Sequence, residues 1–383
     1  MIIYIASSSV DYFGLAFGDG KPPEISQTLY SRLPFAENAD FKHLERHVKK
    51  IVREASEKFL KDSRMRAPDM IYIVLSAPWY LCETKFVKIS RRESFRIDEE
   101  LLNKLMADEI ELFRSKARKN FSEQNLDDLV ILDKEIMRTT VNGYPLKNPL
   151  GKNTLELEVA IYLSGGRKSF LDTLRDILRH FFGDIPMKIV SEPRALFKIL
   201  AGMANSEEGF LVIDVGGEVS EIYLVRRGIL EGVKSFNWGG NLVARRLASL
   251  LNIELEQALS FFKLSGEGDA KPELAQKISP ALEEICQDWQ KLLFESLSEM
   301  GKFAPLPQTL ILLPSASGSD VLAKCANSPD FASFTVLGKP FNVVTFIPEN
   351  FEAKISLRGM DRKDSQMTVP LLLMLSALEY ARS

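Results

Sequence analysis

The chain has 383 residues, which is long enough for two domains with hydrophobic cores of their own. Its composition is ordinary for a globular protein, with 45% hydrophobic residues, 26% charged residues and a formal net charge of −3. Nucleic acid is excluded as the main partner, because phosphate binding needs a concentrated positive surface and no segment is strongly basic. No apolar run reaches the ~18 residues that cross a bilayer.

The cysteines and the N-terminal segment predict a cytoplasmic location. Cys82, Cys286 and Cys325 are far apart, odd in number and without Cys-x-x-Cys spacing. This predicts neither a zinc site nor a disulfide framework, and it is typical of a reducing cytoplasm. Residues 1–13 carry no positive charge before their apolar run, so we expect a strand there rather than a signal peptide.

The first part of the chain predicts a mixed α/β region. Alternating hydrophobicity predicts two short strands within residues 2–17 and a third at 24–31. Residues 40–61 have apolar side chains at three- and four-residue steps and are expected to form an amphipathic helix. A buried strand follows at 70–76.

Residues 79–163 have the pattern of an inserted α+β module. A strand is followed by a long helix at about 97–119, and two more strands follow at 129–141 and 155–163. The chain then returns to alternating helices and strands. We expect a helix at 167–182, a strand at 187–190, a helix at 191–202, a strand hairpin at 210–225, helices from 237 to about 299, a strand at 309–313, a helix at 321–326, a strand at 341–347 and a final apolar helix.

The hairpin FLVIDVGGEVSEIYLV (210–225) has two interpretations. Glycines let a backbone approach a phosphate closely, and a carboxylate at the strand end, here Asp214, can hold hydrated Mg²⁺. Alternatively, Gly216 and Gly217 only make a tight turn. The context favours a ligand, because Gly239-Gly240 opens the next helix and offers a second close approach.

These segments resemble a known family. VIDVGGEVSEIYLV and FNWGGNLVARRLASLLNI are similar to the second phosphate-binding hairpin and following helix of the actin-like ATPases, closest to the cell-division protein FtsA and its pilus-assembly relative PilM. The resemblance implies an α/β fold of actin-like type, a ribonuclease-H-like duplicated core with two lobes and an inserted α+β subdomain. The matching nucleotide-binding positions are Asp214, Gly216, Gly217, Ser220, Glu221, Gly239 and Gly240.

The resemblance also implies domain boundaries. The first lobe would comprise residues 1–78, 164–206 and 350–383, the inserted FtsA-type subdomain residues 79–163, and the second lobe residues 207–349 with an outer helical part at 235–299. The segment VNGYPLKNPLGKNTLELEVAIYLS (141–164) resembles the Asn-Pro-φ-Gly segment of the FtsA insertion and favours that relative.

Three of the four nucleotide-binding elements of the family are altered. In the first strand, Tyr4 and Ala6 stand where the family has Asp and Gly, which leaves Ser7, Ser8 and Ser9 as the remaining phosphate donors. On the ribose-side helix the family's Glu is Leu259, and Lys263 is displaced by one position. In the adenine-side loop only Gly318 is retained.

These changes predict weak or absent binding of ATP and Mg²⁺. Glu192, in the place where relatives orient the attacking water, is the candidate catalytic residue, and Asp214 is the candidate Mg²⁺ ligand. Hydrolysis needs a metal-bound phosphate held between two opposing hairpins. We therefore expect a degenerate ATPase site kept for protein contacts, with an active Mg-dependent ATPase as the alternative.

The family resemblance implies partners and a location. The leading hypothesis is an FtsA-like division scaffold that self-associates into filaments and binds a protein such as FtsZ. The alternative is a PilM-like cytoplasmic adaptor for the tail of a pilus-assembly membrane protein. Either would lie in the cytoplasm at the inner face of the plasma membrane and reach it through a partner. The final helix, VPLLLMLSALEYARS, is expected to be the last core helix and not a membrane anchor.

Two weaker signals remain. His43 and His47 have the spacing of a zinc-binding pair, but no third ligand is evident and a solvated helix face is expected. Three small clusters of basic residues have two interpretations: ordinary surface charge, or contact with an acidic lipid surface or partner tail. They are Lys49-Lys50 with Arg53, Arg91-Arg92 and Arg245-Arg246.

Overall fold

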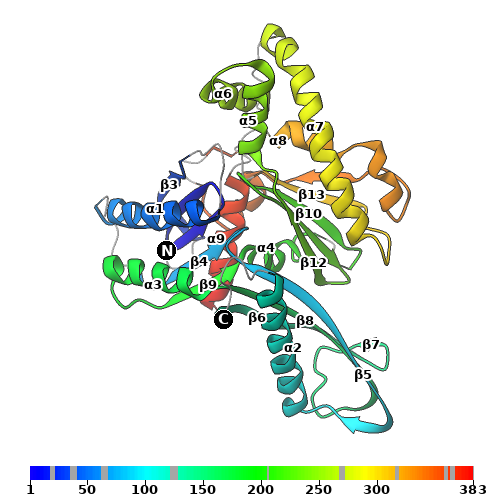
Figure 1. Cartoon of the computed structure of the whole chain (residues 1–383). Coiled ribbons are helices and arrows are strands. Elements are labelled where there is room, and N and C mark those ends of the chain that lie inside the picture. The colour runs from blue at the N-terminus through cyan, green and yellow to red at the C-terminus, as the bar shows by residue number, and fades with distance from the viewer. Residues whose placement is uncertain are drawn as a thin grey trace.

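Two five-stranded sheets with the same strand arrangement form the centre of the protein (Figure 1). The computed structural model describes residues 1–17, 22–34, 41–61, 68–120, 128–204, 207–266, 272–314, 319–357, 361–362 and 367–382. The sheet orders are β3-β2-β1-β4-β9 and β12-β11-β10-β13-β14. In each sheet the first three strands along the chain form an antiparallel meander, and two later strands extend the sheet with parallel pairing. The predicted duplicated core is confirmed.

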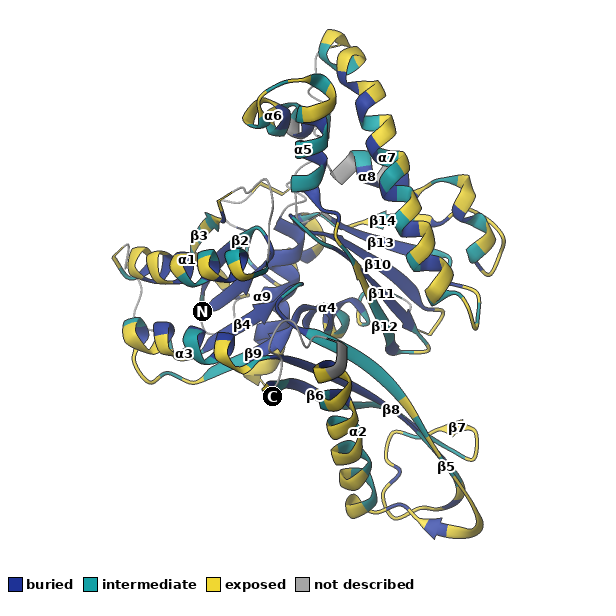
Figure 2. Ribbon diagram, in the orientation of Figure 1, coloured by how far each residue is buried: buried dark blue, intermediate teal, exposed yellow. Residues whose placement is uncertain are grey.

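Apart from β12, which was not predicted, the strands begin and end close to the predicted positions. In the first sheet they are β1 (Ile2–Ile5), β2 (Ser9–Ala16), β3 (Glu24–Arg32), β4 (Ile71–Leu75) and β9 (Met187–Ser191). In the second they are β10 (Phe210–Val215), β11 (Ser220–Arg226), β12 (Ile229–Phe236), β13 (Thr309–Pro314) and β14 (Asn342–Thr345). The central strands are buried on both faces, which explains their continuous hydrophobic runs (Figure 2).

Helices cover both faces of each sheet. The helices α4 (Glu192–Leu200) and α9 (Thr368–Arg382) share one hydrophobic core with residues of both sheets. The outer face of the first sheet packs on α1 (Phe41–Lys61) and α3 (Lys168–Phe182). The outer face of the second sheet packs on α5 (Gly240–Leu251), α6 (Leu255–Gly266), α7 (Pro272–Met300) and α8 (Ser319–Ala326). Two short 3₁₀ helices lie at Pro329–Phe334 and Pro348–Phe351.

The helix α9 is buried along most of its length. Residues 368–378 are all buried, and they contact β1 of the first sheet as well as β13 of the second. A helix that is hydrophobic all round needs such surroundings. The core position predicted for this segment is therefore correct, but the helix serves both sheets. No helix among the described residues has the length and apolarity that a membrane span requires.

The insertion between β4 and α3 forms a sheet of its own. The strand order is β5-β8-β6-β7, and the helix α2 (Glu99–Asn120) packs on one face. Its strands are β5 (Leu81–Arg96), β6 (Leu129–Val141), β7 (Tyr144–Pro145) and β8 (Asn153–Arg167). This arrangement matches the α+β module that the sequence predicted.

One prediction about side chains was wrong. Cys286 of α7 and Cys325 of α8 form a disulfide, with their Cα atoms 5.8 Å apart, because the two helices pack together although the cysteines are 39 positions apart in sequence. His43 and His47 are half-buried, and Lys42 and Arg46 beside them are exposed, so the helix surface there is partly solvated. Glu45 between them is buried and forms ion pairs with Lys49 and with Arg167.

Candidate functional site

The turn between β1 and β2 touches the turn between β10 and β11. The hydroxyl of Ser7 accepts a hydrogen bond from the backbone N–H of Glu218, with a distance of 3.0 Å. A Cβ placed on Gly217 would lie 2.1 Å from the side-chain atoms of Ser8. Gly217 therefore makes room for Ser8, in the region where the actin-like family is expected to hold phosphate between the two turns.

The N-terminus of α5 is already bonded to the same turn. The backbone N–H of Gly240 donates to the carbonyl of Gly216 at 2.9 Å, and that of Asn241 donates to the carbonyl of Gly217 at 2.8 Å. Free N–H groups at a helix N-terminus are what binds an anion. At this helix two of them are used inside the protein. A Cβ on Gly239 would lie 2.3 Å from the Gly217 carbonyl oxygen, so glycine is required for this close approach.

A carboxylate of the protein itself lies at the N-terminal part of α5. The side-chain amide of Asn241 donates to Glu218 at 2.8 Å, and the guanidinium of Arg245 forms an ion pair with the same carboxylate. This pairing places a negative charge where the helix dipole favours one. Arg245 is thus engaged inside the protein, and Arg246 pairs with Asp288 of α7 at 2.6 Å.

Three buried carboxyl groups meet at the junction of the two sheets. Glu192 of α4, Asp214 of β10 and Glu221 of β11 each have an oxygen within 4.8 Å of the others. The Tyr4 hydroxyl donates to Glu192 at 2.9 Å, so Tyr4 occupies the side of the cluster expected for the family's first carboxylate. The Tyr80 hydroxyl donates to Glu221 at 2.6 Å.

Burial keeps protons on this cluster. It raises the pKa of Glu221 to about 7, and the negative charge of Asp214 adds to the shift, while hydrogen bonds from Tyr80 and the Ala77 backbone oppose it. Burial followed by repulsion from Asp214 and Glu221 raises the pKa of Glu192 well above its ordinary value. Buried carboxyl groups that lie this close together cannot all ionise. Protonation, rather than a counterion, therefore neutralises part of their charge.

The other predicted site residues are separated by the fold. Ser9 donates to Asp11 at 2.8 Å, and Ser220 donates to the carbonyl of Trp238, so both serve the strands that carry them. Lys263 belongs to α6, but its side chain lies outside the described residues, as does Gly318. The group Glu192, Asp214 and Glu221 is the sole set of three potential metal ligands in the described part of the chain, so the zinc interpretation of His43 and His47 gains no support.

The residues present do not fit Mg²⁺·ATP. The space between the turns contains Ser7 and Ser8, the α5 amides are bonded to the opposite turn, and Tyr4 stands beside Glu192. Mg²⁺ bound with nucleotide keeps several waters and needs an accessible carboxylate. Asp214 and Glu192 are only 1% and 0% exposed.

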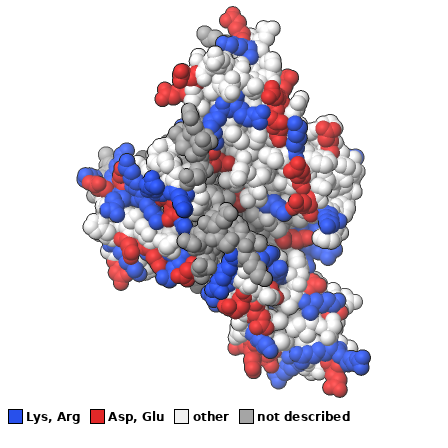
Figure 3. Space-filling model, viewed as in Figure 1, with Lys and Arg blue, Asp and Glu red and all other residues white. Residues whose placement is uncertain are grey.

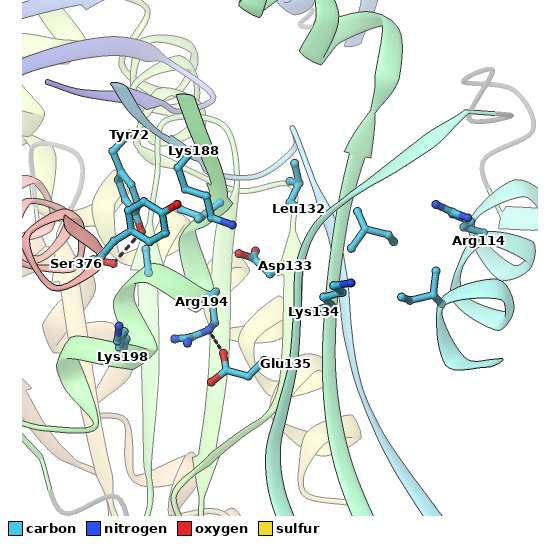
Figure 4. A pocket seen from close by; sticks show the side chains of 15 residues that line it. Tyr72, Arg114, Leu132, Asp133, Lys134, Glu135, Lys188, Arg194, Lys198 and Ser376 are labelled. Carbon is cyan, nitrogen blue, oxygen red and sulfur yellow. Dashed lines mark hydrogen bonds and ion pairs between the residues drawn. The ribbon is translucent and has the colours of Figure 1, made fainter. Parts of the chain in front are cut away.

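A second candidate site lies between the first sheet and the insertion, and sequence reasoning missed it. It is a cavity of about 580 Å³, drawn in Figure 4. The strands β4, β6 and β9 and the helices α2, α4 and α9 all contribute to its walls. Because these elements are distant in sequence, no local sequence motif indicates the cavity.

Positive charge dominates this cavity. Five cations line it against two carboxylates: Arg114, Lys134, Lys188, Arg194 and Lys198 against Asp133 and Glu135. Arg194 pairs with Glu135 (Figure 4). Asp133 accepts hydrogen bonds from Ser164 and Ser191. Tyr72 and Tyr380 add apolar surface with their rings 5.7 Å apart. We name this cavity, with these lining residues, the cationic groove.

Comparison with known proteins was informative at the level of structure. No protein-family model matches the chain, and no curated protein matches it in sequence. A solved structure described as a PilM-PilN type IV pilus biogenesis complex is similar, with a TM-score of 0.63 and 18% identity over 98% of this chain and 97% of that chain.

Two further structures are similar at lower TM-scores. The MamK double helical filament has a TM-score of 0.45 and 10% identity, over 98% of this chain and 99% of that chain. The ethanolamine utilization protein EutJ from Carboxydothermus hydrogenoformans has a TM-score of 0.44 and 11% identity, over 98% and 88%. Together with the repeated sheet order, the likeness to the pilus complex shows that this chain has the two-lobed fold of the actin-like ATPases.

Proposed function

We propose that this protein is an actin-like adaptor that does not hydrolyse ATP. The observation that carries the proposal is the direct contact between the two turns, in which Ser7 and Ser8 occupy the phosphate region and Gly217 makes room for them. A fold that has filled its own nucleotide site retains large surfaces for protein contacts. We also propose that the two lobes and the insertion are divided at residues 78, 164, 206 and 350.

The assembly that it serves is a pilus-type machine at the inner face of the plasma membrane. The likeness to a PilM-PilN complex over 98% of this chain supports this choice. In this proposal the protein is cytoplasmic, is recruited to the membrane by a partner, and self-associates on that surface. The cationic groove receives a cytoplasmic tail of the partner, because its cations and tyrosine rings suit a peptide with carboxylates and apolar side chains.

A division scaffold of the FtsA type is the second candidate. The Asn148-Pro149-Leu150-Gly151 segment that suggested it forms a turn before β8, with Gly151 at a φ of +77°. The Gly151 backbone N–H donates to the carbonyl of Ile97 at 2.8 Å, which anchors the turn to the start of α2. This segment supports the division role only by its resemblance, so the two partners need a direct comparison.

Nucleotide titration tests the loss of the ATP site. We expect no binding of Mg²⁺·ATP tighter than a Kd of about 1 mM, because the backbone N–H groups of Glu218, Gly240 and Asn241 already donate hydrogen bonds within the protein. The measurement is isothermal calorimetry with a parallel phosphate-release assay, and actin serves as the positive control. Micromolar affinity with measurable phosphate release would establish the ATPase alternative instead.

Charge reversal in the cationic groove tests the adaptor role. Lys188→Glu with Lys198→Glu is expected to weaken binding of the partner tail at least ~10-fold, since it places negative charge against carboxylates. Titration of purified protein with the cytoplasmic tail of the pilus membrane protein from the same genome provides the measurement. Arg91→Glu with Arg92→Glu, on β5 of the insertion, is the matched control. If the division protein FtsZ binds and the pilus tail does not, the second candidate replaces the first.

A further inference from the structure

The first three turns of α1 present positive charge to solvent. Lys42, Arg46, Lys50 and Arg53 are exposed and follow one another at steps of four, four and three residues. Side chains at these steps lie on one face of a helix. We call these four residues the α1 stripe. The eleven steps from Lys42 to Arg53, at ~1.5 Å per residue, make it about 16 Å long. Figure 3 shows Lys and Arg gathered over this helix.

Little within the described structure neutralises the α1 stripe. Glu45, the only acidic residue between 41 and 53, is buried and turned toward Arg167 and Lys49. Lys50 approaches Glu54 at 3.7 Å, with 70% and 61% of the two side chains exposed, so this pair is weak. Among the described residues, Lys42, Arg46 and Arg53 form no ion pair.

One end of the stripe is unfavourable for the helix itself. The first turn of α1 contains no acidic residue, and Lys42 there faces the positive end of the helix dipole. Its apolar residues Leu44, Val48 and Ile51 are buried against the first sheet and take no part in the exposed face. Three of the four exposed cations of the stripe form no ion pair with a described residue, so they are available to an external partner of negative charge.

We propose that the α1 stripe binds the anionic surface of a lipid bilayer. A row of cations on a convex helix fits a flat charged surface, whereas a peptide partner needs a groove or an apolar anchor, and the buried apolar face of α1 offers neither. Lys and Arg near an anionic bilayer act additively and lose their effect as salt screens them. The stripe lies on the outer face of the first sheet, while α4 and α9 place the cationic groove on the other face. A bilayer and a partner tail can therefore be bound together.

Sedimentation with vesicles tests this proposal without any partner. The intact protein is expected to bind phosphatidylcholine vesicles only when they contain phosphatidylglycerol, and to be released at high salt. The variant K42Q/R46Q/K50Q/R53Q is expected to lose affinity by roughly several-hundredfold, from about fivefold for each charge. R91Q/R92Q removes two exposed cations from β5 and is expected to bind like the unmodified protein.

Each outcome is decisive. Equal binding to neutral and anionic vesicles, or unchanged binding by the quadruple variant, overturns the proposal. Binding of a poly-glutamate peptide to the stripe without binding to anionic vesicles also overturns it, in favour of an acidic protein partner. Circular dichroism checks that the variants are folded. The salt dependence of vesicle binding is measured on the unmodified protein, so this part of the test does not depend on the folding of any variant. Because no nucleotide or partner tail is present, failure here leaves the adaptor proposal unchanged.

Discussion

Replacing Gly217 by alanine is expected to lower the free energy of unfolding by about 1–3 kcal/mol, because the new methyl group overlaps atoms already in place. Its Cβ would lie 2.1 Å from the Cβ and Oγ of Ser8. In a protein with an open phosphate site this space would be available to the methyl group. Urea unfolding of the purified variant, followed by fluorescence, measures the loss.

Two further variants separate this contact from general intolerance of alanine. Ser8→Gly removes both overlapping atoms, so the double variant with Gly217→Ala is expected to recover most of the lost stability. Gly239→Ala is the matched control, because its Cβ would meet the backbone of Gly216 and Gly217 at 2.3–2.5 Å. It is expected to destabilise at least as strongly and to gain nothing from Ser8→Gly. Strictly additive effects of Ser8→Gly and Gly217→Ala would show that the two turns do not touch.

Stability is expected to fall as the pH rises from about 5 to about 8. The folded protein holds protons on Glu221, whose pKa is raised to about 7, and on Glu192, whereas the unfolded chain releases them near 4.5. The stabilising contribution is therefore complete below the unfolded pKa and is lost as the pH passes through the folded one. For Glu221 alone this amounts to roughly 3 kcal/mol. Asp11, raised to about 6 mainly by burial, acts in the same direction.

The variant Glu221→Gln tests the source of this pH dependence. Glutamine keeps the shape and an acceptor for Tyr80, but it does not ionise, so the fall in stability between pH 5 and pH 8 should become smaller. Urea unfolding at several pH values measures it, with EDTA present in a parallel series. A stability that rises over this range, or one that depends on EDTA, would contradict proton sharing and indicate a bound cation.

The arrangement of strands and helices could be predicted from the sequence because it depends on local patterns. Alternation in residues 2–17 predicted the first hairpin, and two hydrophobic runs around Gly216-Gly217 predicted the second. The apolar run of α9 required burial on all sides. The inserted module was visible as a change from βα alternation to long strands around one helix. The substitution at Tyr4 was also visible, since a tyrosine cannot act as the missing carboxylate.

Features that depend on packing between distant segments could not be predicted. The contact of Ser8 with Gly217 joins turns from the two sheets, and the disulfide of Cys286 with Cys325 depends on how α7 packs on α8. The cationic groove is built from six elements, so its charges are scattered along the chain. The carboxylate of Glu218 at α5 is a further example, because its partner Asn241 lies 23 positions away in the sequence.

The most direct test of the filled nucleotide site is a crystal structure of the protein grown with Mg²⁺ and a non-hydrolysable ATP analogue. We predict that Ser7 still accepts the Glu218 backbone N–H, that Tyr4 still donates to Glu192, and that no nucleotide lies between the turns. Ordered nucleotide with Mg²⁺ on Asp214, with the two turns moved apart and Tyr4 displaced, would contradict it.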